Sequence, residues 1–194
     1  MLSINSLLPP ASISQIQSWI HQLGVIVELS KPRKTKLGDF KVQGRDMFIS
    51  INNNLNPYSC LITLTHELAH AFVYIRYKNR IKPHGREWQL TFKSMLLHFM
   101  SPDYFPHDIL QVLSLYIKKP TASTLTDVSL STVLKVYDAH QTLSISEITK
   151  GEKFKTNKGR IFIKGPQLRK RFKCIEYQTN NVYSFHPLTE ITRL

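Results

Sequence analysis

Residues 57 to 77, PYSCLITLTHELAHAFVYIRY, form a predicted helix with apolar side chains on nearly every side. The preceding Asn56 marks its start, because asparagine caps helix N-termini and the proline that follows suits the first helical position. A helix that is apolar all round is buried. Its middle nevertheless carries three adjacent or nearly adjacent polar residues: His66, Glu67 and His70. The sequence therefore predicts a buried central helix with polar groups that need partners.

The spacing of these three residues is typical of a metallopeptidase. In a helix, residues four apart share a face, so His66 and His70 can direct their imidazoles to one point, with Glu67 beside them. Zinc binds imidazole nitrogen, and a catalytic zinc site keeps three protein ligands and a water. Glu67 would take the proton of the zinc-bound water as it attacks a peptide carbonyl and pass it to the leaving amine. The HExxH pattern thus predicts zinc-dependent peptide hydrolysis.

A satisfied structural hydrogen-bond cluster is the alternative explanation for polar groups in a buried helix. A catalytic site also needs a third ligand, which could be Asp, Glu or His. His84 is the best placed, since thirteen residues separate it from His70 and it directly precedes a predicted helix. The adjacent Gly85 lets the backbone pass close to the site, and a helix entrance holds a ligand rigidly.

Shorter elements flank the central helix. Apolar periodicity and turn residues predict helices at 12–23, 86–100 and from about 106 to 117, and strands at 25–29 and between 40 and 51. The segment TASTLTDVSLST, residues 121–132, is rich in Ser and Thr without a clear period, which indicates a linker. We therefore expect one domain over 1–120, a linker over 121–132, and a small β-rich segment over 133–194.

The chain is basic, with 26 Lys and Arg against 13 Asp and Glu and a net charge of +13. Such a surface favours a polyanionic partner, most commonly nucleic acid. From Lys150 to Lys173 there are ten Lys and Arg and one acid. Alternation in LRKRFKC places Arg169, Arg171 and Lys173 on one face of a predicted strand. The candidate nucleic-acid contacts are Lys153, Lys155, Arg169, Arg171 and Lys173, and a solvated edge strand that uses charge against aggregation is the alternative.

Other classes of protein are disfavoured by the sequence. The start, MLSINSLLPPASISQ, lacks the basic and apolar regions of a signal peptide, and no apolar run reaches the about 18 residues of a membrane span. Two cysteines far apart in sequence, Cys60 and Cys174, do not form a disulfide framework. We expect a cytoplasmic protein with protein substrates and DNA as partners, and no membrane partner.

HELAH, followed at this distance by HGREW, resembles the SprT-like (Spartan) family of zinc metalloproteases. The preceding TKLGDF and ISINNNLNPY are similar to that family's strand segments, and the resemblance covers about residues 10 to 120. It implies His66, His70 and His84 as ligands of one zinc ion per chain and Glu67 as the general base. It further implies an α+β fold, a minimal zincin-like domain of helices and a small antiparallel sheet, and cleavage of proteins trapped on DNA.

The tail departs from this resemblance. Many family members carry a four-cysteine zinc ribbon after the protease domain, whereas 133–194 holds Cys174 alone and so resembles a ribbon without its cysteines. The leading hypothesis is a zinc endopeptidase acting on proteins bound or crosslinked to DNA. The alternatives are a nucleic-acid-binding protein with a structural or vestigial zinc site, and a general zinc peptidase with no link to DNA.

Overall fold

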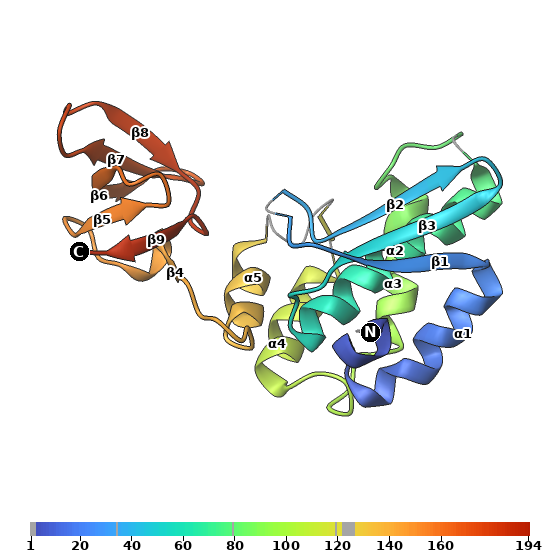
Figure 1. Cartoon of the computed structure of the whole chain (residues 1–194). Coiled ribbons are helices and arrows are strands. Elements are labelled where there is room, and N and C mark those ends of the chain that lie inside the picture. The colour runs from blue at the N-terminus through green and yellow to red at the C-terminus, as the bar shows by residue number, and fades with distance from the viewer. Residues whose placement is uncertain (1–2, 34, 79, 119, 122–126) are drawn as a thin grey trace. The chain divides into compact units, whose positions relative to one another are not determined.

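The computed structural model describes residues 3–33, 35–78, 80–118, 120–121 and 127–194 of the chain. The chain divides into two compact units, unit 1 (Met1–Ala139) and unit 2 (His140–Leu194). Within the described residues, no helix has the length and apolar character that crossing a membrane requires. The fold class is α+β, as predicted (Figure 1).

Unit 1 combines five helices with a three-stranded sheet in its described part. Its strands are β1 (Val25–Ser30), β2 (Gly38–Gln43) and β3 (Asp46–Asn52). Its helices are α1 (Ile13–Leu23), α2 (Pro57–Tyr77), α3 (Arg86–Leu97), α4 (His107–Tyr116) and α5 (Val128–Lys135), preceded by the short 3-10 turns η1 (Ile4–Leu7) and η2 (Pro10–Ser12).

The sheet of unit 1 is mixed, so the prediction of an antiparallel sheet is wrong in this detail. Its order is β1-β3-β2, with β2 antiparallel to β3 and β1 parallel to β3. A tight turn at Gly44, whose φ is 63°, joins β2 to β3 and forces that pair to be antiparallel. The longer connection after β1 lets β2 take the far side of β3, which leaves β2 at the edge of the sheet.

The connection into β2 is held by Asn52, a buried residue at the end of β3. Its side-chain amide donates to the carbonyl oxygens of Arg33 and Lys36, each at 3.0 Å. Arg33 in turn donates to the side-chain Oδ1 of Asn52 and to the hydroxyl and backbone carbonyl of Ser50. These bonds fix the start of β2 next to the central helix.

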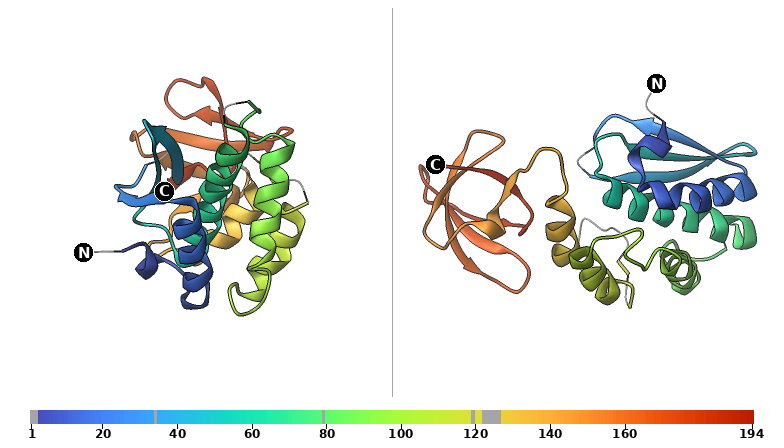
Figure 2. Two further views of the ribbon diagram at one scale, coloured as in Figure 1. Left: turned by 90° about the vertical axis from the view of Figure 1, so that its right-hand side faces the viewer. Right: turned by 90° about the horizontal axis from the view of Figure 1, so that it is seen from below.

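Helix α2 has the bounds predicted from the sequence. The side-chain oxygen of Asn56 accepts a hydrogen bond from the backbone N–H of Ser59 at 2.9 Å, which is the expected N-cap. The helix lies between the sheet and α3 (Figures 1 and 2). Because both flanks are covered, most of its residues from Ser59 to Val73 are buried. The all-round apolar pattern of this segment thus reflects a central position in the core.

Helix α5 overlaps the end of the linker predicted over 121–132, so that prediction is wrong from Val128 onward. Residues 122–126 of the predicted linker lie outside the described part of the chain. Leu130 and Leu134 are buried in the core of unit 1. The amide of Asn56 donates to the carbonyl of Leu134 at 2.9 Å and to Asp138 at 2.6 Å. Tertiary packing therefore makes a helix of a Ser- and Thr-rich segment, and the two units divide after Ala139 instead of at 121–132.

Unit 2 is a six-stranded antiparallel sheet in the order β4-β9-β5-β6-β7-β8. Its core is apolar and includes Phe154, Phe162, Phe172, Cys174 and Ile191. The tail is thus β-rich, as predicted, and an apolar core takes the place of the four metal-binding cysteines of a zinc ribbon. The strands are β4 (Leu143–Ser144), β5 (Lys153–Thr156), β6 (Ile161–Gln167), β7 (Phe172–Glu176), β8 (Val182–Phe185) and β9 (Glu190–Arg193), with the 3-10 turn η4 (Ile145–Glu147) after β4.

Candidate metal centre

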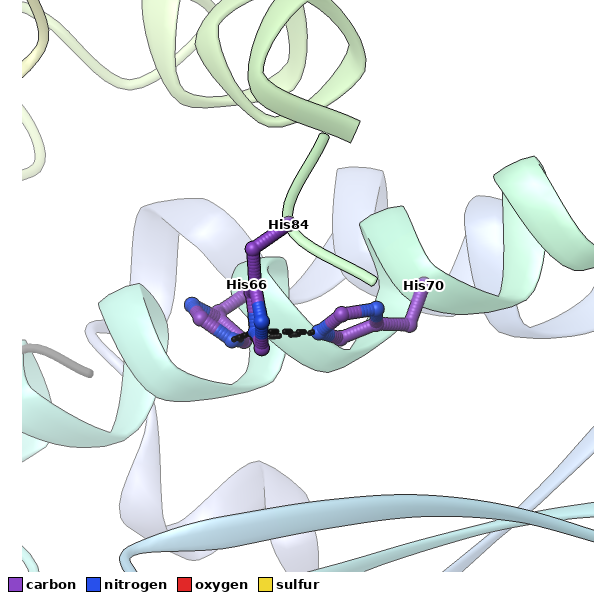
Figure 3. A group of neighbouring side chains, drawn as sticks. All are labelled: His66, His70 and His84. Carbon is purple, nitrogen blue, oxygen red and sulfur yellow. Dashed lines mark hydrogen bonds between the residues drawn. The ribbon is translucent and has the colours of Figure 1, made fainter. Parts of the chain in front are cut away.

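The imidazoles of His66, His70 and His84 meet at one point (Figure 3). His66 and His70 project from one face of α2, and His84 comes from the loop before α3. Their Nε2 atoms are 3.2 Å apart for His66 and His84, 3.3 Å for His70 and His66, and 2.9 Å for His70 and His84. The structure thus brings together the three ligands predicted from the sequence.

Mutual hydrogen bonds do not satisfy three ring nitrogens that face one another. Each nitrogen either carries a proton and donates or has a lone pair and accepts, so at least two of the three are of the same kind and repel. A single cation accepts all three lone pairs. Nitrogens bound to a tetrahedral zinc ion at about 2.0–2.1 Å lie about 3.3 Å from one another. The donor set and its spacing of 2.9 to 3.3 Å fit such an ion.

Burial keeps these imidazoles neutral, which is the form that binds a metal. It lowers the pKa of His66 to about 2, with smaller contributions from the charges of His70 and His84. It lowers the pKa of His70 to about 4, with His84 adding to the effect. The pKa of His84 is lowered by burial as well. At neutral pH each imidazole is therefore uncharged, and its Nε2 offers a lone pair when the proton is on Nδ1.

The ring of Trp88 packs against the rings of all three histidines. Its ring is fully buried, and its centroid is 4.5 Å from the ring of His66, 4.7 Å from that of His84 and 5.2 Å from that of His70. Phe92 stacks on Trp88, and their ring centroids are 5.0 Å apart. Because tightly packed rings have few rotamers, this stack holds the imidazoles in place.

The backbone of His84 adopts a left-handed conformation, with φ at 57°. This conformation costs a non-glycine residue about 1–2 kcal/mol. Gly85 follows it and its N–H donates to the carbonyl of Lys82 at 3.0 Å, and a Cβ at Gly85 would lie 2.9 Å from that carbonyl oxygen. This tight turn directs the His84 side chain back toward His66 and His70 on α2. The strained backbone thus occurs at the residue that completes the histidine cluster.

Glu67 lies beside the histidines and faces β2. Burial is the main cause that raises its pKa to about 8, and Asp39 adds to the rise. A hydrogen bond from the backbone N–H of Phe40 and the charges of Arg33 and Lys36 act in the opposite direction. A carboxylate with a raised pKa binds protons more readily, which suits a general base.

Gly38 makes room for this carboxylate at the start of β2. A Cβ at this position would lie 2.8 Å from Cγ and Oε1 of Glu67 and 2.8 Å from Cγ2 of Thr63. Any other residue would therefore displace Glu67 or the edge strand. The side-chain oxygen of Thr63 is itself buried and has no hydrogen-bond partner among the described residues.

The histidines and Glu67 line an open cleft of about 390 Å³ between β2, α2 and the loop before α3. Phe40 forms part of one wall and stacks on His70 at 6.5 Å with a tilt of 8° between the rings. The cleft is open to solvent, so a polypeptide segment can reach the metal centre.

Residues 13–106 match the family model described as the SprT-like family. This segment, just under half of the chain, is similar to the SprT-like family. The matched segment runs from α1 to the start of α4 and contains all three histidines and Glu67. The search of curated proteins found no match to the chain, and neither did the search of solved structures.

Two residues of the candidate site, Trp88 and Gly38, were not predicted from the sequence. Trp88 lies within the helix predicted over 86–100, but no local pattern marks its packing against all three histidines. Gly38 was not singled out at all. Its role depends on contact with Glu67 and Thr63, which are 25 or more residues away in the chain. No local pattern signals such a contact.

The basic residues predicted to contact nucleic acid lie outside the SprT-like segment, in unit 2. Lys153, Lys155 and Lys173 are exposed on β5 and β7. The prediction that Arg169 and Arg171 lie on a strand is wrong, because β7 begins at Phe172 and both arginines belong to the turn before it. The chain reverses between β6 and β7 at these residues, where the N–H of Leu168 donates to the carbonyl of Arg171 at 2.7 Å. The guanidinium of Arg171 donates to the side chain and the carbonyl of Ser184.

Proposed function

We propose that the protein is a zinc-dependent endopeptidase in which His66, His70 and His84 hold the metal and Glu67 is the general base. The convergence of three neutral imidazoles beside a buried carboxylate, in an open cleft, carries the proposal. The match of residues 13–106 to the SprT-like family model supports a metalloprotease-type function.

A zinc ion held by three imidazoles supplies Lewis acidity, which polarises a carbonyl and lowers the pKa of water to about 7. Glu67 accepts a proton from the attacking water and delivers it to the leaving amine. Gly38 and the N–H of Phe40 position the Glu67 carboxylate for this transfer. The rings of Phe40 and Trp88 keep the imidazoles oriented and shield one side of the site from water.

A closed structural zinc site, the main alternative, requires four protein ligands. Within the part of the chain that the structure describes, the cluster consists of three histidines, and they line an accessible cleft. This arrangement favours a catalytic over a structural metal.

The variants Glu67→Gln and His84→Ala test the proposal. We expect Glu67→Gln to retain about one zinc per chain and to lose at least about 10²-fold in cleavage rate on an unfolded protein, because it lacks the base. We expect His84→Ala to lose both metal and activity. Metal content by mass spectrometry and cleavage by gel electrophoresis are measured on the same samples. Full activity in Glu67→Gln would overturn the mechanism, and a wild-type protein that binds zinc without cleaving anything would support a structural role.

We further propose that the substrates are proteins bound or crosslinked to DNA. The net charge of +13 supports a polyanionic partner. The test compares cleavage of one protein substrate, free and crosslinked to DNA, at low and high salt. Faster cleavage of the crosslinked form at low salt is expected, and equal rates at every salt concentration would favour a general peptidase.

A further inference from the structure

The cleft that holds the three histidines continues along α2 beyond His70. Its lining passes Val73 and Tyr74 and reaches Lys78, the residue that follows the last turn of α2. Because an α-helix rises about 1.5 Å per residue, Lys78 lies about 12 Å beyond His70 along the helix. An extended peptide covers that distance in about three or four residues. The cleft therefore also contacts side chains that flank the bond to be cleaved.

The loop after α2 adds a second lysine to the lining. Lys82 lines the cleft together with Lys78 and lies shortly before His84 in the chain. Both lysines are exposed. Neither has an ion-pair partner among the described residues. Two positive charges without a protein counter-ion thus line a cleft that a polypeptide has to enter.

The acids of the lining do not neutralise these two lysines. Asp39 is paired with Lys36, whose Nζ lies 2.9 Å from its carboxylate. Glu67 lies beside the histidines and faces β2. The part of the cleft formed by the end of α2 and the following loop is therefore positively charged, and it attracts negatively charged groups.

Lys78 is held against the wall of the cleft. Its backbone has a φ of 53° and a ψ of −139°, a conformation that residues other than glycine rarely adopt. Its N–H donates to the carbonyl of Tyr74 at 2.7 Å, and its ammonium lies 4.9 Å from the centre of the Tyr74 ring. The helix dipole favours a cation at the C-terminus of α2. It does not account for Lys82, which belongs to the loop.

We propose that Lys78 and Lys82 bind carboxylates of the substrate, so that the cleft favours acidic polypeptide segments. The proposal rests on the peptidase of the proposed function and adds a substrate class. The carboxylates can belong to Asp and Glu side chains near the cleaved bond or to the C-terminus of a substrate chain.

The size of the cleft favours a polypeptide over a nucleic acid as the partner of these lysines. A volume of about 390 Å³ holds a short extended segment and excludes a duplex. Because both lysines are exposed, each contributes a modest preference. Such a preference ranks substrates without restricting the peptidase to one sequence.

The test uses peptides with blocked ends and one shared apolar centre, flanked on both sides by glutamates, glutamines or lysines. At low salt, we expect kcat/KM to be about three- to tenfold higher for the glutamate peptide than for the glutamine peptide, and lowest for the lysine peptide. Salt at about 0.5 M should reduce these ratios, since exposed charges are screened. The glutamine peptide with a free C-terminus, compared with its blocked form, measures the contribution of a terminal carboxylate.

The double variant Lys78→Glu and Lys82→Glu should reverse the order, so that the lysine peptide is cleaved fastest. A folding defect lowers all three rates and cannot reverse their order. Lys93→Glu is the matched control, because Lys93 is exposed on α3 and lies outside the cleft lining. It makes the same change of charge at one site and should keep the wild-type order. Equal rates for all three peptides in the wild type, or the wild-type order in the double variant, would overturn the proposal.

The failure of this proposal and that of the proposed function are distinguishable by a binding measurement. Fluorescence anisotropy of the labelled peptides with the Glu67→Gln chain reports on the lysines without any cleavage. A chain that binds the glutamate peptide through both lysines but cleaves no peptide loses the peptidase alone. A chain that cleaves all three peptides equally loses the carboxylate subsite alone. A single-stranded oligonucleotide that binds Lys78 and Lys82 more tightly than the glutamate peptide does would also overturn the subsite.

Discussion

At the scale of single residues, the candidate site depends on one position that lacks a side chain. Gly38 lets the edge strand approach α2 so closely that a Cβ would lie 2.8 Å from the Glu67 carboxylate. The three histidines proposed to bind the metal belong to α2 and to the loop before α3. In the proposed mechanism, Gly38 therefore positions the base Glu67 and leaves metal binding to other residues.

The variant Gly38→Ala tests this separation. The added methyl should displace Glu67 and lower kcat by about 10²-fold, since a shift of about 1 Å at a catalytic group costs that much. Zinc content and KM should stay close to the wild-type values. Both are measured alongside the initial cleavage rate.

Gly44→Ala is the control for the strain of replacing a glycine. Gly44 has a φ of 63°, and nothing lies within 4 Å of a Cβ built there. This variant should lose stability, by about 1 kcal/mol, and keep its cleavage rate. Equal losses of kcat in both variants would show that Gly38 matters only for folding.

The cluster of three histidines could be predicted from the sequence because its geometry is local or nearly so. The positions of His66 and His70 follow from helical periodicity, and His84 stands out by its place at a helix entrance. The roles of Gly38 and Phe40 could not be predicted, because their contacts with α2 depend on how strand β2 packs against that helix. Such contacts appear only once the sheet and helix are packed together.

At the scale of elements, a helix or strand could be predicted when the residues that determine it lie within its own sequence. The bounds of α2 could be predicted from its cap and its apolar run. Helix α5 could not, because its sequence, VSLSTVLK, is a poor helix former by composition. It is helical because Leu130 and Leu134 are buried against unit 1. The strand predicted for LRKRFKC is wrong in its first half because Leu168 to Arg171 form the turn between β6 and β7.

Strand β7 also carries an acid-sensitive contact in unit 2. Glu176 accepts hydrogen bonds from Arg160 at 2.5 Å and from Thr179 at 2.5 Å. The bond from Arg160 is the main cause that lowers the pKa of Glu176 to about 2, below its usual value of 4.5. Because the folded state favours the ionised form, this contribution to stability is complete above about pH 4.5 and is lost as the pH falls toward 2.

We therefore expect the free energy of unfolding of unit 2 to decrease between about pH 4.5 and pH 2. Glu176→Gln should be less stable than the wild type at pH 7 and should show a flatter dependence in this range. Chemical denaturation followed by NMR of unit 2 resonances measures both. An unchanged pH dependence in Glu176→Gln would assign the acid sensitivity to other groups, such as Glu152, whose pKa is also lowered.

At the scale of the whole molecule, the chain has two separate apolar cores. The core of unit 1 includes both tryptophans, Trp19 and Trp88, and that of unit 2 includes neither. Tryptophan fluorescence therefore reports on unit 1 alone. Because Trp88 contacts all three histidines, its emission should also respond to metal binding.

A chelator should lower the unfolding temperature of unit 1 and leave that of unit 2 unchanged. A ligand present at about 100 times its Kd stabilises the folded state by about 2.7 kcal/mol. Removing it should shift the tryptophan transition by roughly 5 to 10 °C. Circular dichroism at wavelengths dominated by strands follows unit 2 in the same sample. A shift of both transitions together would show that the units unfold as one.

The covalent continuity of the two units has a kinetic consequence. If unit 2 binds DNA that carries a crosslinked protein, that protein stays near the cleft. Its effective concentration is then in the millimolar range, as for sites joined by a short linker. A cleft with weak intrinsic affinity then becomes saturated. Selectivity would thus come from residence on the nucleic acid, and one peptidase site could accept many unrelated sequences without degrading free proteins at the same rate.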